Sequence, residues 1–327
     1  MSTPPPVALT CGDPSGVGPE LAAKAWGILK GKLTFFWIGD PRHLPSGTAV
    51  VEISEPSDAS KSMSDGLPVL AQTFPKVPVP GSPSPENASA IVTAIEMAVD
   101  LALSGKASAV CTSPIAKKVL VDHAGFPYPG HTEFLAALGG AKKSVMMLAS
   151  DELKVVPATI HIPLREVPNA LSAELLEETI RILHSSLRED FGLEHPRIAV
   201  AGLNPHAGEG GLLGTEDDEI IRPVCENMIA NGLKVVGPLP ADTMFHSKAR
   251  MAYDAAVAMY HDQALVPIKT LAFDRGVNVT LGLPFVRTSP DHGTAFDIAG
   301  QGVADPTSLV EALLLADQMA SNRAKLS

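Results

Sequence analysis

Short runs of apolar and β-branched residues alternate along the chain with longer stretches whose apolar positions repeat at helical spacing. The runs "VALTCG" at residues 7–12 and "LTFFWIGD" at 33–40 are short and rich in strand-forming residues. Between residues 87 and 104, by contrast, apolar side chains recur every three or four positions, which predicts an amphipathic helix. Alternation of this kind along a whole chain is typical of α/β architecture.

Residues that cap helices or interrupt strands refine this pattern. Ser172 precedes a stretch with an apolar inner face, and Asp305 with the following proline opens a C-terminal helix. We expect helices to begin also at Ser113, which is followed by proline, and at Thr132, which precedes an apolar helical pattern. The stretch at 68–85 contains six prolines and predicts an exposed loop or an edge excursion.

Three histidines stand where apolar, strand-like runs end. They are His161 in "VVPATIHIPL", His206 in "RIAVAGLNPHAG" and His261 in "AAVAMYHDQ". Ligands of open α/β sheets bind beyond the carboxyl ends of the strands, so three imidazoles meeting there would form a metal site with positions open for substrate. The alternative is that each is a separate loop or core histidine. The long separations between them match no metal-binding motif, so the placement alone leaves both interpretations open.

Two further groups of residues are candidates for anion binding. Lys269, Asn278 and Arg287 are spaced nine apart, and the two cations lie among apolar residues, where a charge is rarely buried unless it is paired. His131 and Thr132 precede an apolar helical pattern, and a helix start at this point would offer free amides to an anion. The alternative for the second group is an ordinary helix cap, which this segment alone favours slightly.

Composition narrows the possible partners. The 327 residues suffice for roughly two domains. The formal net charge of −11, without any dense Lys/Arg run, argues against nucleic acid or an anionic membrane as a partner. The start, "MSTPPPVALT", lacks the basic and apolar regions of a secretory signal, and the cysteines lie about a hundred residues apart. We therefore expect a cytoplasmic protein without a disulfide framework.

Seven motifs in chain order resemble those of the 4-hydroxythreonine-4-phosphate dehydrogenase family, which acts in pyridoxal phosphate synthesis. They are "GDPSGVGPE", "TSPIAKKVL", "GFPYPGHTEFLA", "LNPHAGEGGLLGTED", "GPLPADTMF", "YHDQALVPIK" and "RTSPDHGTAFDIAGQGVADP". The last is also similar to the His-Gly signature of isocitrate and isopropylmalate dehydrogenases. The resemblance implies two α/β/α domains with a cleft between them, as in those dehydrogenases. We expect residues 1–128 with 303–327 to form a first, discontinuous domain, and residues 129–302 to form a second that carries the dimer interface and the metal site.

The resemblance also assigns roles to individual residues. It implies that a homodimer shares one divalent metal per site between its subunits, with Zn²⁺ preferred and Co²⁺ or Mg²⁺ possible, because imidazole ligands replace the aspartates of the isocitrate enzymes. The ligands would be His161, His206 and His261.

The resemblance also implies positions for the substrate and the cofactor. The substrate-binding positions would be His131, Thr132, Lys269, Asn278 and Arg287. His292 and Gly293 would receive the adenosine end of NAD or NADP. Asp242 is a candidate to orient a ligand or accept a proton, and the alternative is an aspartate that caps a turn or helix.

The implied reaction is oxidation of the C3 hydroxyl of 4-phosphohydroxy-L-threonine, followed by β-decarboxylation to 3-amino-2-oxopropyl phosphate and CO₂. A metal would acidify the alcohol and then serve as the electron sink for decarboxylation, while NAD takes the hydride. One alternative is a related dehydrogenase of 4-phospho-threonate or 4-phospho-erythronate, which needs the same metal, cofactor and anion contacts. A more distant alternative is a phosphate acyltransferase of similar fold, which needs neither NAD nor the metal.

Overall fold

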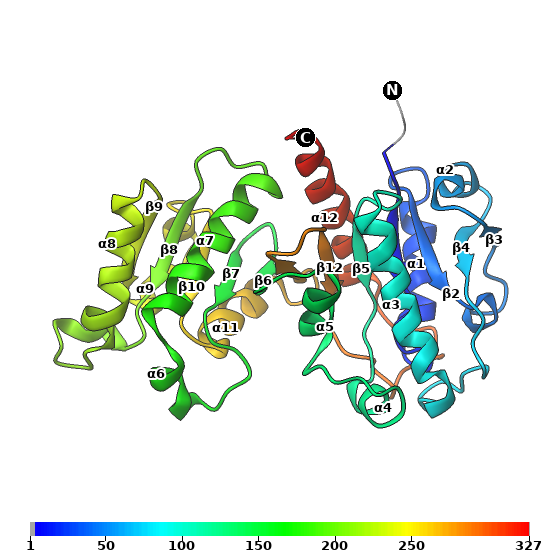
Figure 1. Ribbon diagram of the computed structural model, residues 1–327, viewed down its shortest axis with the longest axis horizontal. Coiled ribbons are helices and arrows are strands. Elements are labelled where there is room, and N and C mark those ends of the chain that lie inside the picture. The colour runs from blue at the N-terminus through cyan, green and yellow to red at the C-terminus, as the bar shows by residue number, and fades with distance from the viewer. Residues whose placement is uncertain (1–3, 327) are drawn as a thin grey trace. The chain divides into compact units, whose positions relative to one another are not determined.

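The computed structural model describes residues 4–326, which divide into two compact units (Figure 1). Unit 1 comprises the chain up to Ser144 together with Leu283–Ser321, and unit 2 comprises Val145–Gly282 together with the residues from Asn322 on. The first three residues of the "MSTPPPVALT" stretch lie outside the described part. No helix within residues 4–326 is long and apolar enough to cross a membrane.

Unit 1 is built on an all-parallel sheet with the strand order β3-β4-β2-β1-β5-β12. Its elements are β1 (Val7–Thr10), α1 (Gly18–Leu29), β2 (Phe35–Gly39), β3 (Val50–Ile53), α2 (Ala59–Ser62), β4 (Leu67–Ala71), α3 (Ala88–Leu103), β5 (Val110–Thr112), α4 (Lys117–His123), α5 (His131–Leu138), β12 (Arg287–Pro290) and α12 (Thr307–Ala324), whose last turn belongs to unit 2. Consecutive residues of β2 point to opposite faces, yet Phe35, Phe36 and Trp37 are all buried, so both faces of the sheet are covered there.

Unit 2 has a mixed sheet with the order β11-β6-β7-β10-β8-β9, in which β7, β10, β8 and β9 are parallel. Its elements are β6 (Val145–Ala149), β7 (Lys154–Pro157), α6 (Val167–Ala170), α7 (Ala173–Glu189), β8 (Arg197–Ala201), α8 (Arg222–Ala230), β9 (Lys234–Leu239), α9 (Ala241–Met244), α10 (Ser247–Arg250), β10 (Ala255–Ala258), α11 (His261–Ala272) and β11 (Val277–Leu281). Two irregular helical turns also matter below: η5 (Pro205–Glu209), and η6 (Asp217–Ile221), which is π-helical.

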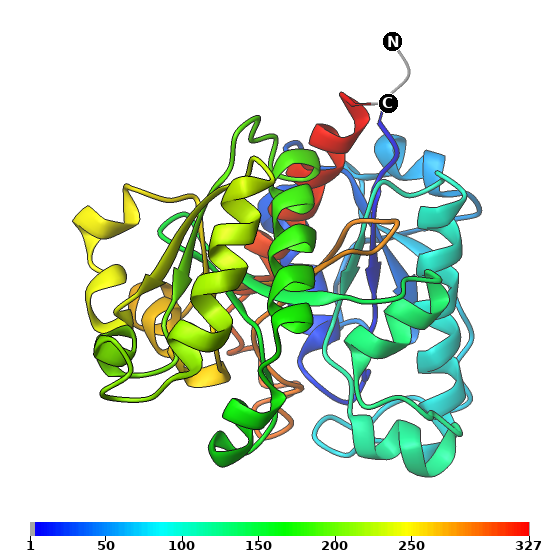
Figure 2. The same ribbon diagram turned by 60° about the vertical axis from the view of Figure 1, so that its left-hand side comes forward.

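Helices cover the sheet of unit 2. Figure 2 shows α7 and α8 side by side against its strands. Ala264, Leu265 and Ile268 of α11 pack in one apolar cluster with side chains of β7, β8 and β10, among them Val155 and Ala256. These helices and strands together confirm the expected α/β fold class.

Several expected element boundaries hold. Ser172 accepts a hydrogen bond from the Leu175 amide at 3.1 Å as the N-cap of α7, and Asp305 accepts one from the Thr307 amide at the start of α12. The helix expected at 87–104 is α3. Sequence signals of this local kind succeed because the capping residue and its partner lie within three positions of each other.

Two expected helix starts are wrong. α4 begins at Lys117, because the amide of Ser113 is directed to the Thr10 hydroxyl at 3.3 Å and Pro114 accepts from Asp13, which ties this segment to the end of β1. α5 begins one residue before Thr132, with Gly130 as its N-cap, so Thr132 already has helical geometry and makes no capping bond.

The proline-rich stretch and the domain limits also differ from expectation. Pro68 lies within β4, an interior strand between β3 and β2, so only the remainder of 68–85 is a loop. Residues 129–144 and 283–302, expected in the second domain, fall in unit 1, because α5 contacts α3 and β12 pairs with β5. The end of the chain falls in unit 2, where Arg323 pairs with Asp190.

Candidate active site

The strand order of unit 2 places the three candidate metal ligands at one edge of its sheet. β10 lies between β7 and β8 and is parallel to both. His161 follows β7, His206 follows β8, and His261 follows β10 as the first residue of α11. Carboxyl ends of neighbouring parallel strands meet at the same edge, which is where ligands bind in α/β sheets. The three histidines therefore come from three adjacent strands.

Two of these imidazoles lie next to each other. The ring centroids of His161 and His261 are 5.8 Å apart, and both rings line a pocket of about 340 Å³ together with Tyr260 and Asp262. The Nδ1 of His261 lies 2.6 Å from Oδ1 of Asp262, which leaves Nε2 as the nitrogen available to a ligand. Metal-binding histidines commonly have their second nitrogen bonded to a carboxylate in this way.

His206 is exposed on η5, apart from this pair. No group of three or more His, Cys, Asp or Glu side chains with a geometry that could hold a metal ion occurs within residues 4–326 of the single chain. The donor set still fits a borderline metal such as Zn²⁺ or Co²⁺, because two imidazoles are adjacent, accessible and oriented in part by a carboxylate.

Backbone strain is concentrated in the candidate segments. Among residues 4–326, positive φ angles at non-glycine positions occur at His161 (56°), His206 (53°), Ala207 (53°), Glu209 (45°) and Ala295 (45°). The left-handed region costs a residue with a Cβ atom about 1–2 kcal/mol. Two of the five are candidate ligands themselves, two follow His206 in η5, and Ala295 lies two residues after Gly293. Strain of this kind persists only where surrounding contacts impose it.

Unit 1 contains a buried polar region around Arg287. Arg287 is 3% exposed, begins β12 and donates from Nη2 to the Thr112 hydroxyl at 2.7 Å, at the carboxyl end of β5. Burial lowers the pKa of its guanidinium to about 10. Burial, reinforced by the charge of Arg287, lowers the pKa of His131 to about 3, so that imidazole is neutral at neutral pH.

Several polar atoms in this region have no hydrogen-bond partner in the described part of the chain. They are Nε2 of His131, Oγ of Ser113 and Oδ2 of Asp13. Burial raises the pKa of the Asp13 carboxyl above its usual range. Buried polar atoms without a partner cost roughly 1–3 kcal/mol each, and a polar ligand would remove that cost. Asp13 was not singled out by the sequence, and Ser113 was considered only as a helix start, because the lack of partners for their side chains is visible only in three dimensions.

The expected cofactor residues lie on the loop after β12. Nδ1 of His292 contacts the Gly293 carbonyl at 2.9 Å, whereas its Nε2 is buried without a partner in the described residues and so fits a ligand that offers a hydrogen bond. The amino-terminal glycine-rich turn packs closely on this loop. A Cβ atom on Gly16 would lie 2.7 Å from the Thr294 carbonyl, so glycine is required for that approach.

The remaining candidates lie in unit 2. Lys269 is part of α11, with its ammonium 5.6 Å from the ring of Phe273, and Asn278 is half-buried in β11. Asp242 is exposed in the short helix α9, which lies against η5. Unit 2 therefore holds Lys269, Asn278 and Asp242 with the three histidines, and unit 1 holds His131, Thr132, Arg287 and the cofactor residues.

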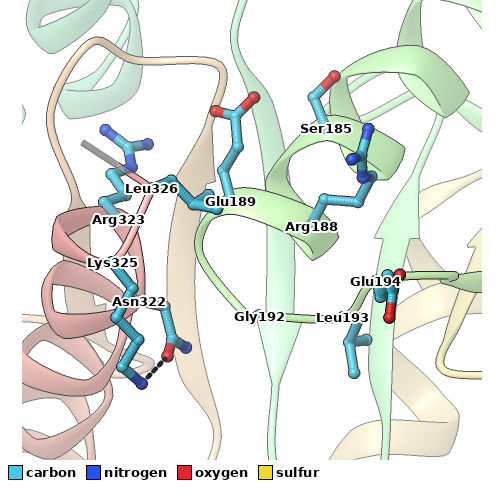
Figure 3. Close-up of a pocket in the computed structure, with 10 residues that line it drawn as sticks. All are labelled: Ser185, Arg188, Glu189, Gly192, Leu193, Glu194, Asn322, Arg323, Lys325 and Leu326. Carbon is cyan, nitrogen blue, oxygen red and sulfur yellow. Dashed lines mark hydrogen bonds between the residues drawn. The ribbon is translucent and has the colours of Figure 1, made fainter.

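A larger pocket of about 680 Å³ lies elsewhere in unit 2 (Figure 3). Arg188 and Lys325 of its lining carry charges opposite to those of Glu189 and Glu194, and Lys325 donates to Asn322 at 3.1 Å. The lining residues from α7 precede β8, whereas His206 follows β8, so the two features lie at opposite ends of that strand. Volume alone therefore does not identify the site.

Comparisons with known proteins agree with the motifs. A family model described as "Pyridoxal phosphate biosynthetic protein PdxA" matches residues 32–316. A protein from Ruegeria sp. (strain TM1040), named 4-hydroxythreonine-4-phosphate dehydrogenase, is 57% identical over 320 residues, or 98% of each chain. One of the same name from Roseobacter denitrificans is 56% identical over 317 residues, or 97% of each chain. A crystal structure of 4-hydroxythreonine-4-phosphate dehydrogenase from Klebsiella pneumoniae matches with a TM-score of 0.89 at 38% identity, covering 98% of this chain and 99% of that one.

Proposed function

The chain belongs to the family of pyridoxal phosphate biosynthetic proteins PdxA, and on that premise we propose that it is a 4-hydroxythreonine-4-phosphate dehydrogenase. The proposed reaction is oxidation of the C3 hydroxyl of 4-phosphohydroxy-L-threonine by NAD or NADP, followed by loss of CO₂ to give 3-amino-2-oxopropyl phosphate. Identity above 50% over nearly the whole length supports the assignment, and the motifs that carry the resemblance include every proposed site residue except His161 and Asn278.

His161, His206 and His261 are the proposed ligands of one divalent metal, in a site shared between the subunits of a homodimer. When bound, the metal would polarise the C3 hydroxyl oxygen and the nicotinamide would take the hydride. The contact between Asp262 and Nδ1 of His261 fixes that imidazole so that Nε2 faces outward from the pair. Asp242, on the helix beside η5, is the proposed group that orients a ligand or holds a proton.

The anionic groups of the substrate are assigned to the cations and their neutral partners. Arg287 can bind a carboxylate or phosphate through two parallel hydrogen bonds, and its burial strengthens such a pair. His131 is neutral and contributes a hydrogen bond rather than a charge. Lys269 supplies a second positive charge, while Thr132 and Asn278 supply polar contacts. This local charge offsets the overall −11, which would repel a phosphorylated substrate.

The observation that carries the proposal is the placement of three histidines after three adjacent parallel strands, in a chain this similar to named dehydrogenases. The test is formation of NADH, followed at its absorbance, from 4-phosphohydroxy-L-threonine in protein treated with a chelator and then supplied with Zn²⁺ or Co²⁺. We expect the chelator to abolish turnover and added metal to restore it.

Further assays run in parallel can give results that contradict the proposal. A clear preference for 4-phospho-threonate or 4-phospho-erythronate over the amino acid would contradict the proposed substrate. Turnover that a chelator leaves unchanged would contradict the metal assignment, and acyl transfer to phosphate without NAD would replace the proposed reaction.

A further inference from the structure

Backbone atoms just before His206 are held by side chains from two other elements. The carbonyl of Gly202 accepts from Nε2 of Gln263 at 2.8 Å. The amides of Leu203 and Asn204 donate to the two carboxylate oxygens of Asp217, at 2.8 and 3.1 Å. Three consecutive residues between the end of β8 and η5 are thereby fixed in position.

Asp217 is the more deeply buried of the two holding residues. It is 0% exposed, lies on the π-helical turn η6, and also accepts from Nδ2 of Asn204 at 2.9 Å. A Cβ atom on residue 202 would lie 2.6 Å from Oδ1 of Asp217, so Gly202 makes room for the carboxylate. In the sequence, Asp217 is one of four consecutive acids at 216–219, and its contact with Leu203, fourteen residues away, is not visible there.

Gln263 connects the segment of His206 with that of His261. Its Oε1 accepts from the Met259 amide at 2.7 Å, and its Nε2 donates to Gly202, so both ends of the side-chain amide are used. Met259 directly follows β10 and lies two residues before His261. The Gly202 amide in turn donates to the Leu239 carbonyl of β9 at 2.8 Å, which restrains Gly202 from the other side.

These contacts explain how strained residues persist in an exposed loop. His206 and Ala207 have φ angles of 53°, and η5 contributes no capping side chain of its own. A left-handed residue with a Cβ atom relaxes unless its neighbours are fixed. The preceding segment cannot move without breaking bonds to a buried carboxylate and to Gln263.

We propose that Gln263 and Asp217 are positioning residues that hold the His206 loop in register with the turn that carries His261, so that both imidazoles are placed before a metal arrives. The proposal rests on the proposed function, in which His206 and His261 are metal ligands. Neither positioning residue touches the metal or the substrate. Removing such supporting contacts in metal sites typically costs 10- to 100-fold in metal affinity or activity.

The leading variant is Gln263→Glu. It keeps the shape of the side chain and the oxygen that accepts from the Met259 amide. It replaces the NH₂ group that donates to the Gly202 carbonyl with a second oxygen, which cannot donate and is repelled by the carbonyl oxygen. The matched control is Gln72→Glu in unit 1, because Nε2 of Gln72 likewise donates to a backbone carbonyl, that of Ala90, at 2.8 Å. Asp217→Asn is a second variant. In it, a side-chain NH₂ group replaces the carboxylate oxygen that accepts from the backbone amide and from Nδ2 of Asn204, so donor faces donor. Three quantities are measured for each purified variant. They are the zinc affinity of the metal-free protein by titration calorimetry, the thermal midpoint of the metal-free protein, and kcat.

We expect Gln263→Glu to raise the zinc Kd and lower kcat by about tenfold or more, with a thermal midpoint no lower than that of Gln72→Glu. Zinc affinity and kcat equal to those of Gln72→Glu would overturn the proposal, because the contact would then be only structural. His206→Ala separates this failure from failure of the proposed function. If His206→Ala abolishes zinc binding and Gln263→Glu does not change it, only the positioning role is wrong. If His206→Ala also leaves zinc binding unchanged, the ligand assignment itself is wrong.

Discussion

The candidate residues of the two units differ in their burial and in what fixes their positions. In unit 1, Arg287 is buried and His131 is half-buried with its Nε2 away from solvent, their pKa values are lowered by loss of solvent, and neighbouring polar atoms have no partner in the described part of the chain. In unit 2, His206 is exposed and His261 is 40% exposed. The φ angle of His206 is strained, and hydrogen bonds from the backbone to Asp217 and Gln263 hold the segments before the two histidines.

This difference matches the chemistry assigned to each group. A buried cation in a region of low dielectric binds an anion strongly, because little water competes. A metal ligand needs an accessible lone pair in a fixed direction, which a constrained loop provides without burial. We therefore expect substitutions of the three histidines in unit 2 to affect metal and turnover with little effect on stability, and substitutions of Arg287 and His131 in unit 1 to affect substrate affinity and stability together.

Removing an exposed ring should have the largest effect. His206→Ala is expected to lower kcat by orders of magnitude and to reduce the metal content, while the thermal midpoint changes little because the residue is exposed. Metal analysis of the purified variant beside its kcat and melting curve checks this. Retention of the full metal content would remove His206 from the ligand set.

Removing the buried cation of Arg287 should mainly weaken the binding of the substrate. Arg287→Ala is expected to raise KM for the phosphorylated substrate about 30- to 100-fold, corresponding to a charged hydrogen bond of about 2–3 kcal/mol, with a smaller change in kcat. Lys106→Ala is the control, since it removes one positive charge from an exposed ion pair in the same unit. An effect on kcat alone would contradict a role in ground-state binding.

The smallest expected effect is on the pH dependence of stability. His131 has a folded pKa of about 3, against about 6.5 when unfolded, so the unfolded chain binds more protons between these values and stability falls as the pH drops below 6.5. His131→Gln should remove on the order of 2 kcal/mol of the loss between pH 7 and pH 5. Urea midpoints at both pH values, with the exposed His195→Gln as control, measure it. Equal losses in the His131 variant and the unsubstituted protein would show that His131 is not buried as a neutral ring.

Sequence patterns were most informative where the cause is local. The caps at Ser172 and Asp305 were predicted because each side chain bonds an amide two or three residues later. The starts expected at Ser113 and Thr132 were wrong, because contacts with the end of β1 and the geometry of Gly130 override the same signal. Tertiary contacts decide such cases, and a single sequence does not contain them in readable form.

For the site, placement at the ends of strand-like runs suggested the three histidines, and the resemblance of the motifs indicated Arg287 and His131. The supporting residues were not predictable. Asp217 is one of four consecutive acids, and Gln263 had no distinguishing pattern, since its two partners follow different strands. Burial of Arg287 beside Thr112 depends on pairing between β12 and β5, which are far apart in sequence.

X-ray absorption spectroscopy of the zinc-loaded protein tests the central claim most directly. Three imidazole nitrogens at about 2.0–2.1 Å are expected around each zinc ion, and each of His161→Ala, His206→Ala and His261→Ala should remove one of them. A zinc shell with fewer than three imidazoles, or one that these substitutions leave unchanged, would contradict the account.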